Sequence, residues 1–130
     1  MLWSPETSPG AHPYWYPQVL GIYHTQVSTN HPAAQKHSAQ HMQFLWVRWL
    51  GAEPGYRFGS KVARLPKVGF VEATDEDTFG FLDPDLIIQG SHLIPAFNAG
   101  RTYNLMSYDG PTVTRSSNEK DDWVNFYVNM

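Results

Sequence analysis

The chain contains no cysteine among its 130 residues. This absence excludes disulfide bonds, thiolate metal ligands and a cysteine nucleophile, and it suits a reducing compartment. No apolar run approaches the roughly 20 residues that a membrane-spanning helix needs. The opening stretch, MLWSPETSPG, lacks the basic start and continuous apolar segment of a secretory signal. We therefore expect a nuclear or cytoplasmic protein with no membrane partner.

Charge is also scarce. Charged residues make up 16% of the chain and the formal net charge is −3, so the totals do not predict a global electrostatic attraction to nucleic acid. Aromatic residues, in contrast, reach 15% and hydrophobic residues 42%. This length and composition predict one small domain that has more rings than its core can bury.

Short apolar segments separated by turn residues predict an all-β fold. We expect strands at residues 14–24, 43–51, 68–72, 79–82 and 91–97, the third and fourth forming a hairpin. Asp83 as an N-cap and Pro84 as a first helical residue predict one helical turn before the fifth strand. Five or six strands with one short helical turn and long loops are typical of a small SH3-like barrel.

Three regions are expected along the chain. Prolines in residues 1–12 predict a flexible lead-in. Residues 13–103 hold the predicted barrel. Residues 104–130 predict a polar linker followed by WVNFYVNM, which is either a terminal strand or the beginning of a longer element.

The strand at 43–51 decides which rings are candidates for binding. Alternation puts Leu45, Val47 and Trp49 on a core face. Trp46 and Arg48 fall on the other face, which we expect to point outward or to lie under a loop, because arginine is rarely buried unless it is paired. A cage for a methylammonium group needs several rings around a cavity. The candidate rings for this aromatic face are Tyr14, Tyr16, Trp46, Tyr56, Phe79 and Phe81, and packing in the core is the alternative for each.

A second candidate site is basic. Tyr56 and Phe58 interleave with lysines and arginines, and such a mixture contacts phosphates and stacks on bases. The alternative is a solvated loop whose charges pair with the acidic turn at 75–77. The basic residues fall within twenty positions and are Arg48, Arg57, Lys61, Arg64 and Lys67.

Patterns for catalysis and metal binding are missing from the sequence, which has neither a Gly-rich phosphate loop nor a nucleophile elbow. His37 and His41 have a spacing that suits chelation on a helix, but no cysteine or nearby acid completes a site. Asp83 and Asp85 are better explained as a turn and helix start. We therefore expect a protein that is not an enzyme, with no catalytic residue, metal or cofactor.

Three stretches carry a resemblance to a known family: HPYWYPQVLGIYH, MQFLWVRWLG, and KVGFVE followed by FGFLDPDLIIQGSHLIPAF. They resemble a segment near the C-terminus of large proteins encoded by fungal transposable elements of the Plavaka and KDZ type, over residues 12–103. The family implies no activity for this segment, only a context of chromatin and DNA. DLIIQGSHLIPAF is also similar to the end of bromo-adjacent homology (BAH) and Tudor-like domains, which read histone tails or dock proteins, so the resemblance implies a BAH-like barrel.

Together these features predict a non-catalytic binding module of a transposon-derived protein. The favoured partner is a protein or peptide, such as a histone tail, held on the aromatic face. The alternatives are contact with nucleic acid through residues 48–67 and self-association through the aromatic face. The sequence leaves the oligomeric state open.

Overall fold

A computed structural model describes residues 1–7, 11–33, 35, 38–72, 74–105 and 121–130. The strands are β1 (Leu2–Trp3), β2 (Tyr14–Val27), β3 (Gln40–Ala52), β4 (Lys67–Phe70), β5 (Phe79–Leu82), β6 (His92–Pro95), β7 (Arg101–Thr102), β8 (Asp122–Trp123) and β9 (Phe126–Asn129). The helical turns, all of the 3-10 type, are η1 (Ser60–Val62), η2 (Pro84–Leu86) and η3 (Phe97–Ala99). None of these described turns has the length and apolar character needed to cross a bilayer. The predicted all-β fold is confirmed.

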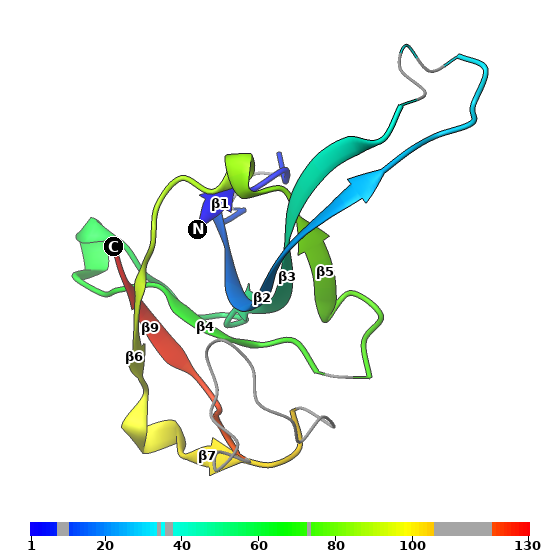
Figure 1. The fold of residues 1–130 in the computed structure, drawn as a ribbon. Coiled ribbons are helices and arrows are strands. Elements are labelled where there is room, and N and C mark those ends of the chain that lie inside the picture. The colour runs from blue at the N-terminus through cyan, green and yellow to red at the C-terminus, as the bar shows by residue number, and fades with distance from the viewer. Residues whose placement is uncertain (8–10, 34, 36–37, 73, 106–120) are drawn as a thin grey trace.

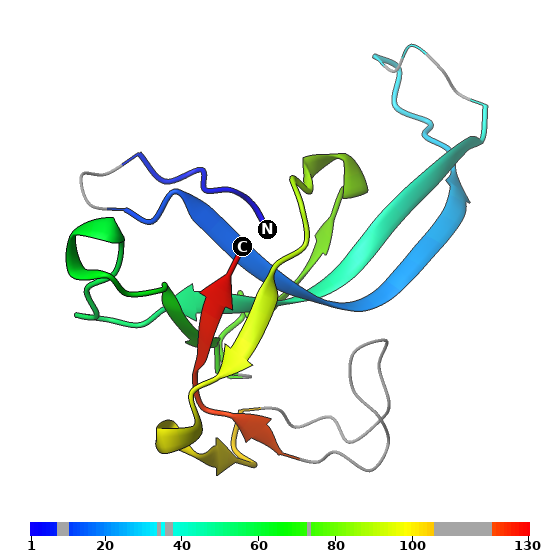
Figure 2. The same cartoon turned by 90° about the vertical axis from the view of Figure 1, so that its left-hand side faces the viewer.

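The main sheet curls into a half-barrel, as Figures 1 and 2 show. Its strand order is β1-β2-β3-β4-β9-β6, and β5 pairs with β3 beside this path. β7 and β8 form a separate two-stranded sheet. The predicted hairpin between the third and fourth strands is wrong, because β4 and β5 both pair with β3. They do so at different points, β4 at Leu50–Ala52 and β5 at Leu45–Arg48.

Two strands come from segments that the sequence placed outside the barrel. β1 lies within the predicted lead-in, pairs with β2 and buries Leu2. β9 lies within the predicted terminal region and inserts between β4 and β6 (Figure 2). WVNFYVNM therefore supplies a strand of the main sheet, which was one of its two expected roles.

β2 and β3 form a long ribbon that projects away from the half-barrel (Figures 1 and 2). Their aromatic and β-branched residues fit a pleated, half-buried surface. The register shifts between Val19 and Gly21, and such a bulge increases the local twist. A Cβ atom at Gly21 would lie 2.5 Å from the ring of Tyr23, so glycine makes room for that ring.

Two apolar clusters stabilise the opposite faces of this sheet. The buried residues of the cluster inside the half-barrel are Met1, Tyr16, Leu50, Val68, Phe70 and Val128. On the other face of β3, Leu45 and Val47 pack with Leu2 and Leu82, and Trp49 packs against them partly buried. The core face predicted for β3 is therefore confirmed.

Arg48 lies inside the half-barrel, which corrects its predicted place on an outer face. Its side chain is 1% exposed, and both terminal nitrogens donate to Oδ2 of Asp122 at 3.2 Å. Nη2 also donates to the carbonyl of Leu105 at 3.1 Å, and the guanidinium carbon lies 3.7 Å from the ring centre of Phe70. The rule that buried arginine is paired holds, but the partner lies 74 residues away, where a local pattern cannot reveal it.

Candidate functional site

A pocket of about 450 Å³ lies beside β2, β3 and the turn before β5. Trp15 and Trp49 meet in it edge to face, with 5.5 Å between their ring centres. They come together because Pro17 pairs opposite Trp49, which puts Trp15 and Trp49 at diagonal positions on one face of the ribbon. The residues lining the pocket are Glu6, Trp15, Trp49, Leu50, Gly51, Val71, Asp77 and Phe79.

The backbone of Trp49 is fixed by the turn that follows β4. Its N–H donates to the carbonyl of Thr78 at 2.9 Å, and its carbonyl accepts from the N–H of Val71 at 3.2 Å. Thr78 is fully buried, and its hydroxyl donates to the carbonyls of Glu72 and Asp75. These contacts build the turn around a buried hydroxyl and hold one wall of the pocket.

The same turn brings a carboxylate to the pocket. The N–H of Asp75 donates to the carbonyl of Glu72 at 2.9 Å, and the N–H of Asp77 donates to Oδ1 of Asp75 at 2.9 Å. Asp77 then lines the pocket together with Glu6, which follows β1. Within the described part of the chain, the ion pairs formed involve neither carboxylate. A cation beside the two tryptophans would therefore meet carboxylates that no protein cation neutralises.

Three of the rings predicted for the aromatic face are placed elsewhere than on a common exposed surface. Tyr16 is only 3% exposed and belongs to the core. Tyr14 packs on Trp3 with 4.9 Å between ring centres. Tyr56 lies 6.3 Å from Tyr127 of β9, on the far side of β4. These rings do not form the single surface that the sequence suggested.

The other three predicted rings, Trp46, Phe79 and Phe81, do come together. Tyr23 and Phe44, which were not predicted, extend them into what we call the aromatic strip. Trp46 stacks on Phe79 with ring centres 5.6 Å apart, and it contacts Phe81 at 4.8 Å. Phe81 meets Phe44 at 5.2 Å, and Phe44 stacks on Tyr23 at 5.5 Å. Phe81 is 69% exposed and Tyr23 50%. The strip is thus a surface feature of the ribbon and of β5.

The basic residues other than Arg48 lie together after β3. None of them forms an ion pair with another described residue, so the predicted pairing with the acidic turn at 75–77 is not found there. The buried Arg48 is separate from this group and pairs with Asp122. The residues that remain of the predicted basic site are Arg57, Lys61, Arg64 and Lys67.

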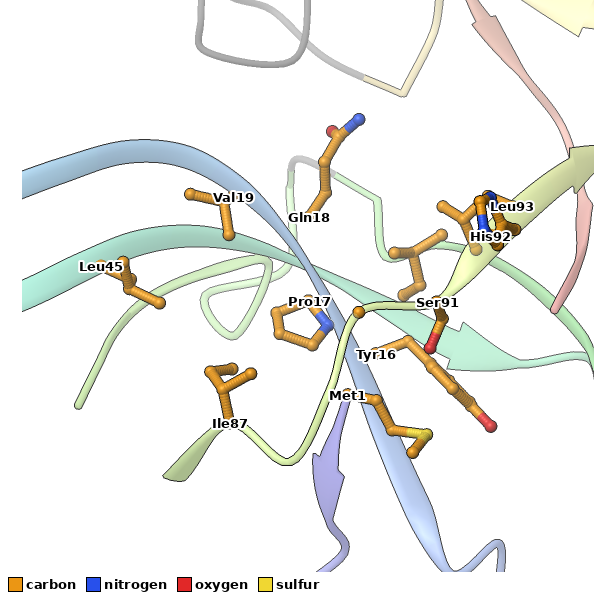
Figure 3. Close-up of a pocket in the computed structure, with 12 residues that line it drawn as sticks. Met1, Tyr16, Pro17, Gln18, Val19, Leu45, Ile87, Ser91, His92 and Leu93 are labelled. Carbon is orange, nitrogen blue, oxygen red and sulfur yellow. The ribbon is translucent and has the colours of Figure 1, made fainter. Parts of the chain in front are cut away.

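A second cavity, of about 470 Å³, opens between β2 and the segment that leads into β6 (Figure 3). Pro17 and Val19 line one side of it, and Ser91 and Leu93 line the other. The hydroxyl oxygen of Ser91 is buried and has no hydrogen-bond partner among the described residues. Its lining among the described residues is largely apolar and includes the polar side chains of Gln18 and His92.

His12 and Tyr16 form a titratable pair near the core. The hydroxyl oxygen of Tyr16 lies 3.2 Å from Nε2 of His12, and the N–H of Tyr14 donates to Nδ1 at 3.3 Å. An accepting Nδ1 requires a neutral ring with its proton on Nε2. Burial lowers the pKa of His12, and burial together with the charge of Tyr14 raises the pKa of Tyr16 to about 12. Both shifts follow from packing and need no catalytic explanation.

The histidines considered for metal binding are placed only in part. His37 lies outside the described residues, and His41 packs against His24 with 5.3 Å between ring centres. Among the described residues, no three His, Asp or Glu side chains gather in a way that would hold a metal ion.

Comparison with known proteins adds nothing to the geometry of the site. No family model matches the chain, and neither a curated protein nor a solved structure matches it. The resemblance to transposable-element proteins therefore stays a prediction.

Sequence reasoning named one residue that lines the pocket, Phe79, and missed the others that form it. Trp49 was assigned to the core, and Trp15 and Glu6 were not considered as binding residues. Asp77 was considered only as part of the acidic turn at 75–77. Alternation along β2 indicates that Trp15 shares a face with Pro17. Only the register of β2 on β3 shows that this face also carries Trp49.

Proposed function

We propose that this chain is a non-catalytic binding module that captures a cationic side chain of a protein partner in the pocket beside Trp15 and Trp49. The observation that carries the proposal is the meeting of two half-buried indole rings and two unpaired carboxylates in one pocket. Ring faces attract cations through their quadrupole, and carboxylates add direct attraction.

The size and chemistry of the pocket support a side chain rather than a whole cofactor. Its volume of about 450 Å³ is near the lower end of small-molecule sites. Its polar groups are acidic, which favours lysine, methylated lysine or arginine over an anionic ligand. Trp49 is fixed by the backbone contacts of Thr78 and Val71, so the site needs little ordering when a ligand binds.

The partner that we propose is a peptide with a methylated lysine, such as a histone tail. Methylation keeps the charge of the ammonium group and reduces its hydration, which suits a partly enclosed aromatic site. The resemblance to transposable-element proteins and to BAH and Tudor-like domains supports a chromatin context. In this proposal the chain contributes binding to a larger protein and has no catalytic role of its own.

The test is a calorimetric titration with a peptide that carries one trimethyllysine, compared with the same peptide carrying its neutral tert-butyl isostere. We expect the cationic peptide to bind more tightly, because only the charge differs. Glu6→Gln combined with Asp77→Asn should weaken binding about two- to thirtyfold, from roughly 0.2–1 kcal/mol for each exposed charge pair. Trp15→Phe should weaken it further, because indole is the strongest of the aromatic partners.

Asp85→Asn is the matched control, because it removes one exposed carboxylate that does not line the pocket. This variant should bind the cationic peptide as the unmodified chain does. Equal affinity for the charged and the neutral peptide would contradict the proposal, as would an equal loss in the Asp85→Asn variant.

Self-association through the aromatic strip is a second candidate function. Lys36 is the only lysine, arginine, aspartate or glutamate between residues 14 and 47, so most of the ribbon is uncharged. Phe81 and Tyr23 of the strip are 69% and 50% exposed. Two copies of an acidic chain can associate through an uncharged apolar surface because no like charges are brought close together there. Sedimentation should show a concentration-dependent dimer that Phe81→Ser and Trp46→Ala weaken, and a monomer at all concentrations would exclude this candidate.

A further inference from the structure

The segment between β3 and β4 is a built loop whose ends meet. The N–H of Glu53 donates to the carbonyl of Lys67 at 2.9 Å, which closes the base. The N–H of Gly59 donates to the carbonyl of Arg64 at 2.9 Å, and the N–H of Arg64 donates back at 3.3 Å, which closes the tip around η1. We call residues 53–67 the basic loop. Compact loops with joined ends present their side chains from a defined backbone.

The cations of the basic loop have no protein counter-charge within the described residues. Arg48 and Arg101 elsewhere in the chain each pair with an aspartate, at 3.2 Å and 2.6 Å. The carboxylate within the loop is that of Glu53, and it accepts a hydrogen bond from Nδ2 of Asn125 at 2.8 Å. The acidic turn before β5 lies on the other side of the half-barrel from η1 (Figure 1). The four cations are Arg57, Lys61, Arg64 and Lys67.

Two tyrosine rings lie among these cations. Nζ of Lys67 lies 5.6 Å from the ring centre of Tyr56 and 6.0 Å from that of Tyr127. The guanidinium carbon of Arg64 lies 5.9 Å from the ring centre of Tyr56. Phe58, which is 39% exposed, adds a third ring on the same loop. Contacts with the rings place Arg64 and Lys67 beside aromatic faces, so charge and stacking surface occur side by side.

We propose that the basic loop binds single-stranded nucleic acid, as a second site that is separate from the pocket of Trp15 and Trp49. Lysine and arginine contact phosphates without reading sequence, and aromatic rings stack on bases whose faces are free. A duplex hides those faces, so the combination of rings and cations favours a single strand. The net charge of −3 gives no attraction at long range, so the affinity depends on these local contacts.

The expected salt dependence follows from the number of cations. Each phosphate that is neutralised on a single strand contributes about −0.7 to the slope of log affinity against log salt. Four contacts therefore predict a slope of about −3 and a loss of about fiftyfold between 50 and 200 mM salt. Arg57→Gln combined with Arg64→Gln should make the slope less steep by about 1.4. Tyr56→Ser should weaken binding about tenfold through lost stacking and leave the slope nearly unchanged.

The experiment is fluorescence polarisation of labelled oligo-dT, oligo-U and a DNA hairpin duplex with the whole chain, across this salt range. Arg101→Gln is the matched control, because it removes one cation outside the basic loop. The proposal is supported if single strands bind with the predicted slope. The slope should become less steep in the Arg57→Gln, Arg64→Gln variant and stay the same in Arg101→Gln. Binding of oligo-dT, of oligo-U or of both with this slope supports the proposal, and a preference between them shows whether the site favours DNA or RNA single strands.

Three outcomes would overturn the proposal: no binding of either single strand at 50 mM salt, tighter binding of the duplex, or an equal change of slope in Arg101→Gln. Circular dichroism of the loop variants separates lost contacts from lost folding. These outcomes are independent of the peptide titration, because the two sites share no residue.

Discussion

The buried pair of Arg48 and Asp122 provides the sharpest test of the structure. Asp122→Ala would leave the guanidinium, which is 1% exposed, without the carboxylate that accepts from both of its terminal nitrogens. Removing one partner of a buried ion pair costs about 3–5 kcal/mol. Asp122 itself is 11% exposed, so water can reach part of the space that it vacates. We therefore expect a loss near the lower end, about 3 kcal/mol of the free energy of unfolding.

The assay is urea unfolding of four chains that form a double-mutant cycle with Arg48→Met. Methionine keeps the apolar packing on Phe70, so this change should cost less than Asp122→Ala. The double variant has no unpaired buried charge. Its cost should therefore fall below the sum of the single costs by about 2 kcal/mol, within the range seen for contacting pairs. Additive costs, or a loss under about 1 kcal/mol for Asp122→Ala, would refute the reasoning.

Three smaller predictions concern pH, packing and capping. Burial lowers the pKa of His12 below its unfolded value of 6.5, so the unfolded chain binds that proton more readily. The urea midpoint should therefore fall as the pH drops below 6.5, and it should fall less in His12→Gln. A Cβ at Gly69 would lie 3.0 Å from the carbonyl of Val124, so Gly69→Ala should cost about 1–3 kcal/mol in thermal unfolding. The side chain of Asp83 accepts from the N–H of Asp85, and Asp83→Ala should cost about 1 kcal/mol.

Local sequence patterns predicted where the strands and helical turns lie better than they predicted which strands pair with each other. Alternation in β3 identified Leu45 and Val47 as core, and the turn chemistry of Asp83 and Pro84 identified η2. The predicted place of Arg48 was wrong because its partner, Asp122, is far away in the sequence. The pairing of β4 and β5 with β3, rather than with each other, depends on how the sheet curls, which short-range alternation does not encode.

The candidate sites show the same limit. Composition indicated that some rings stay at the surface, and Trp46 with Phe79 and Phe81 forms such a surface. The pocket of Trp15 and Trp49 could be predicted only with knowledge of the register between β2 and β3. The basic residues were grouped because they are close in the sequence. This grouping is right for the residues of the basic loop. It is wrong for Arg48, whose side chain points from β3 into the interior.

The insertion of β9 between β4 and β6 has a consequence for synthesis of the chain. β4 and β6 are synthesised before residues 126–129 exist, and until β9 joins them the edges that will flank it are unpaired. Pairing Lys67 with Tyr127 closes a long loop, and contacts of that kind form slowly. Unpaired strand edges are sites of aggregation. A nascent or truncated chain that ends before β9 should therefore depend on chaperones far more than the finished protein does.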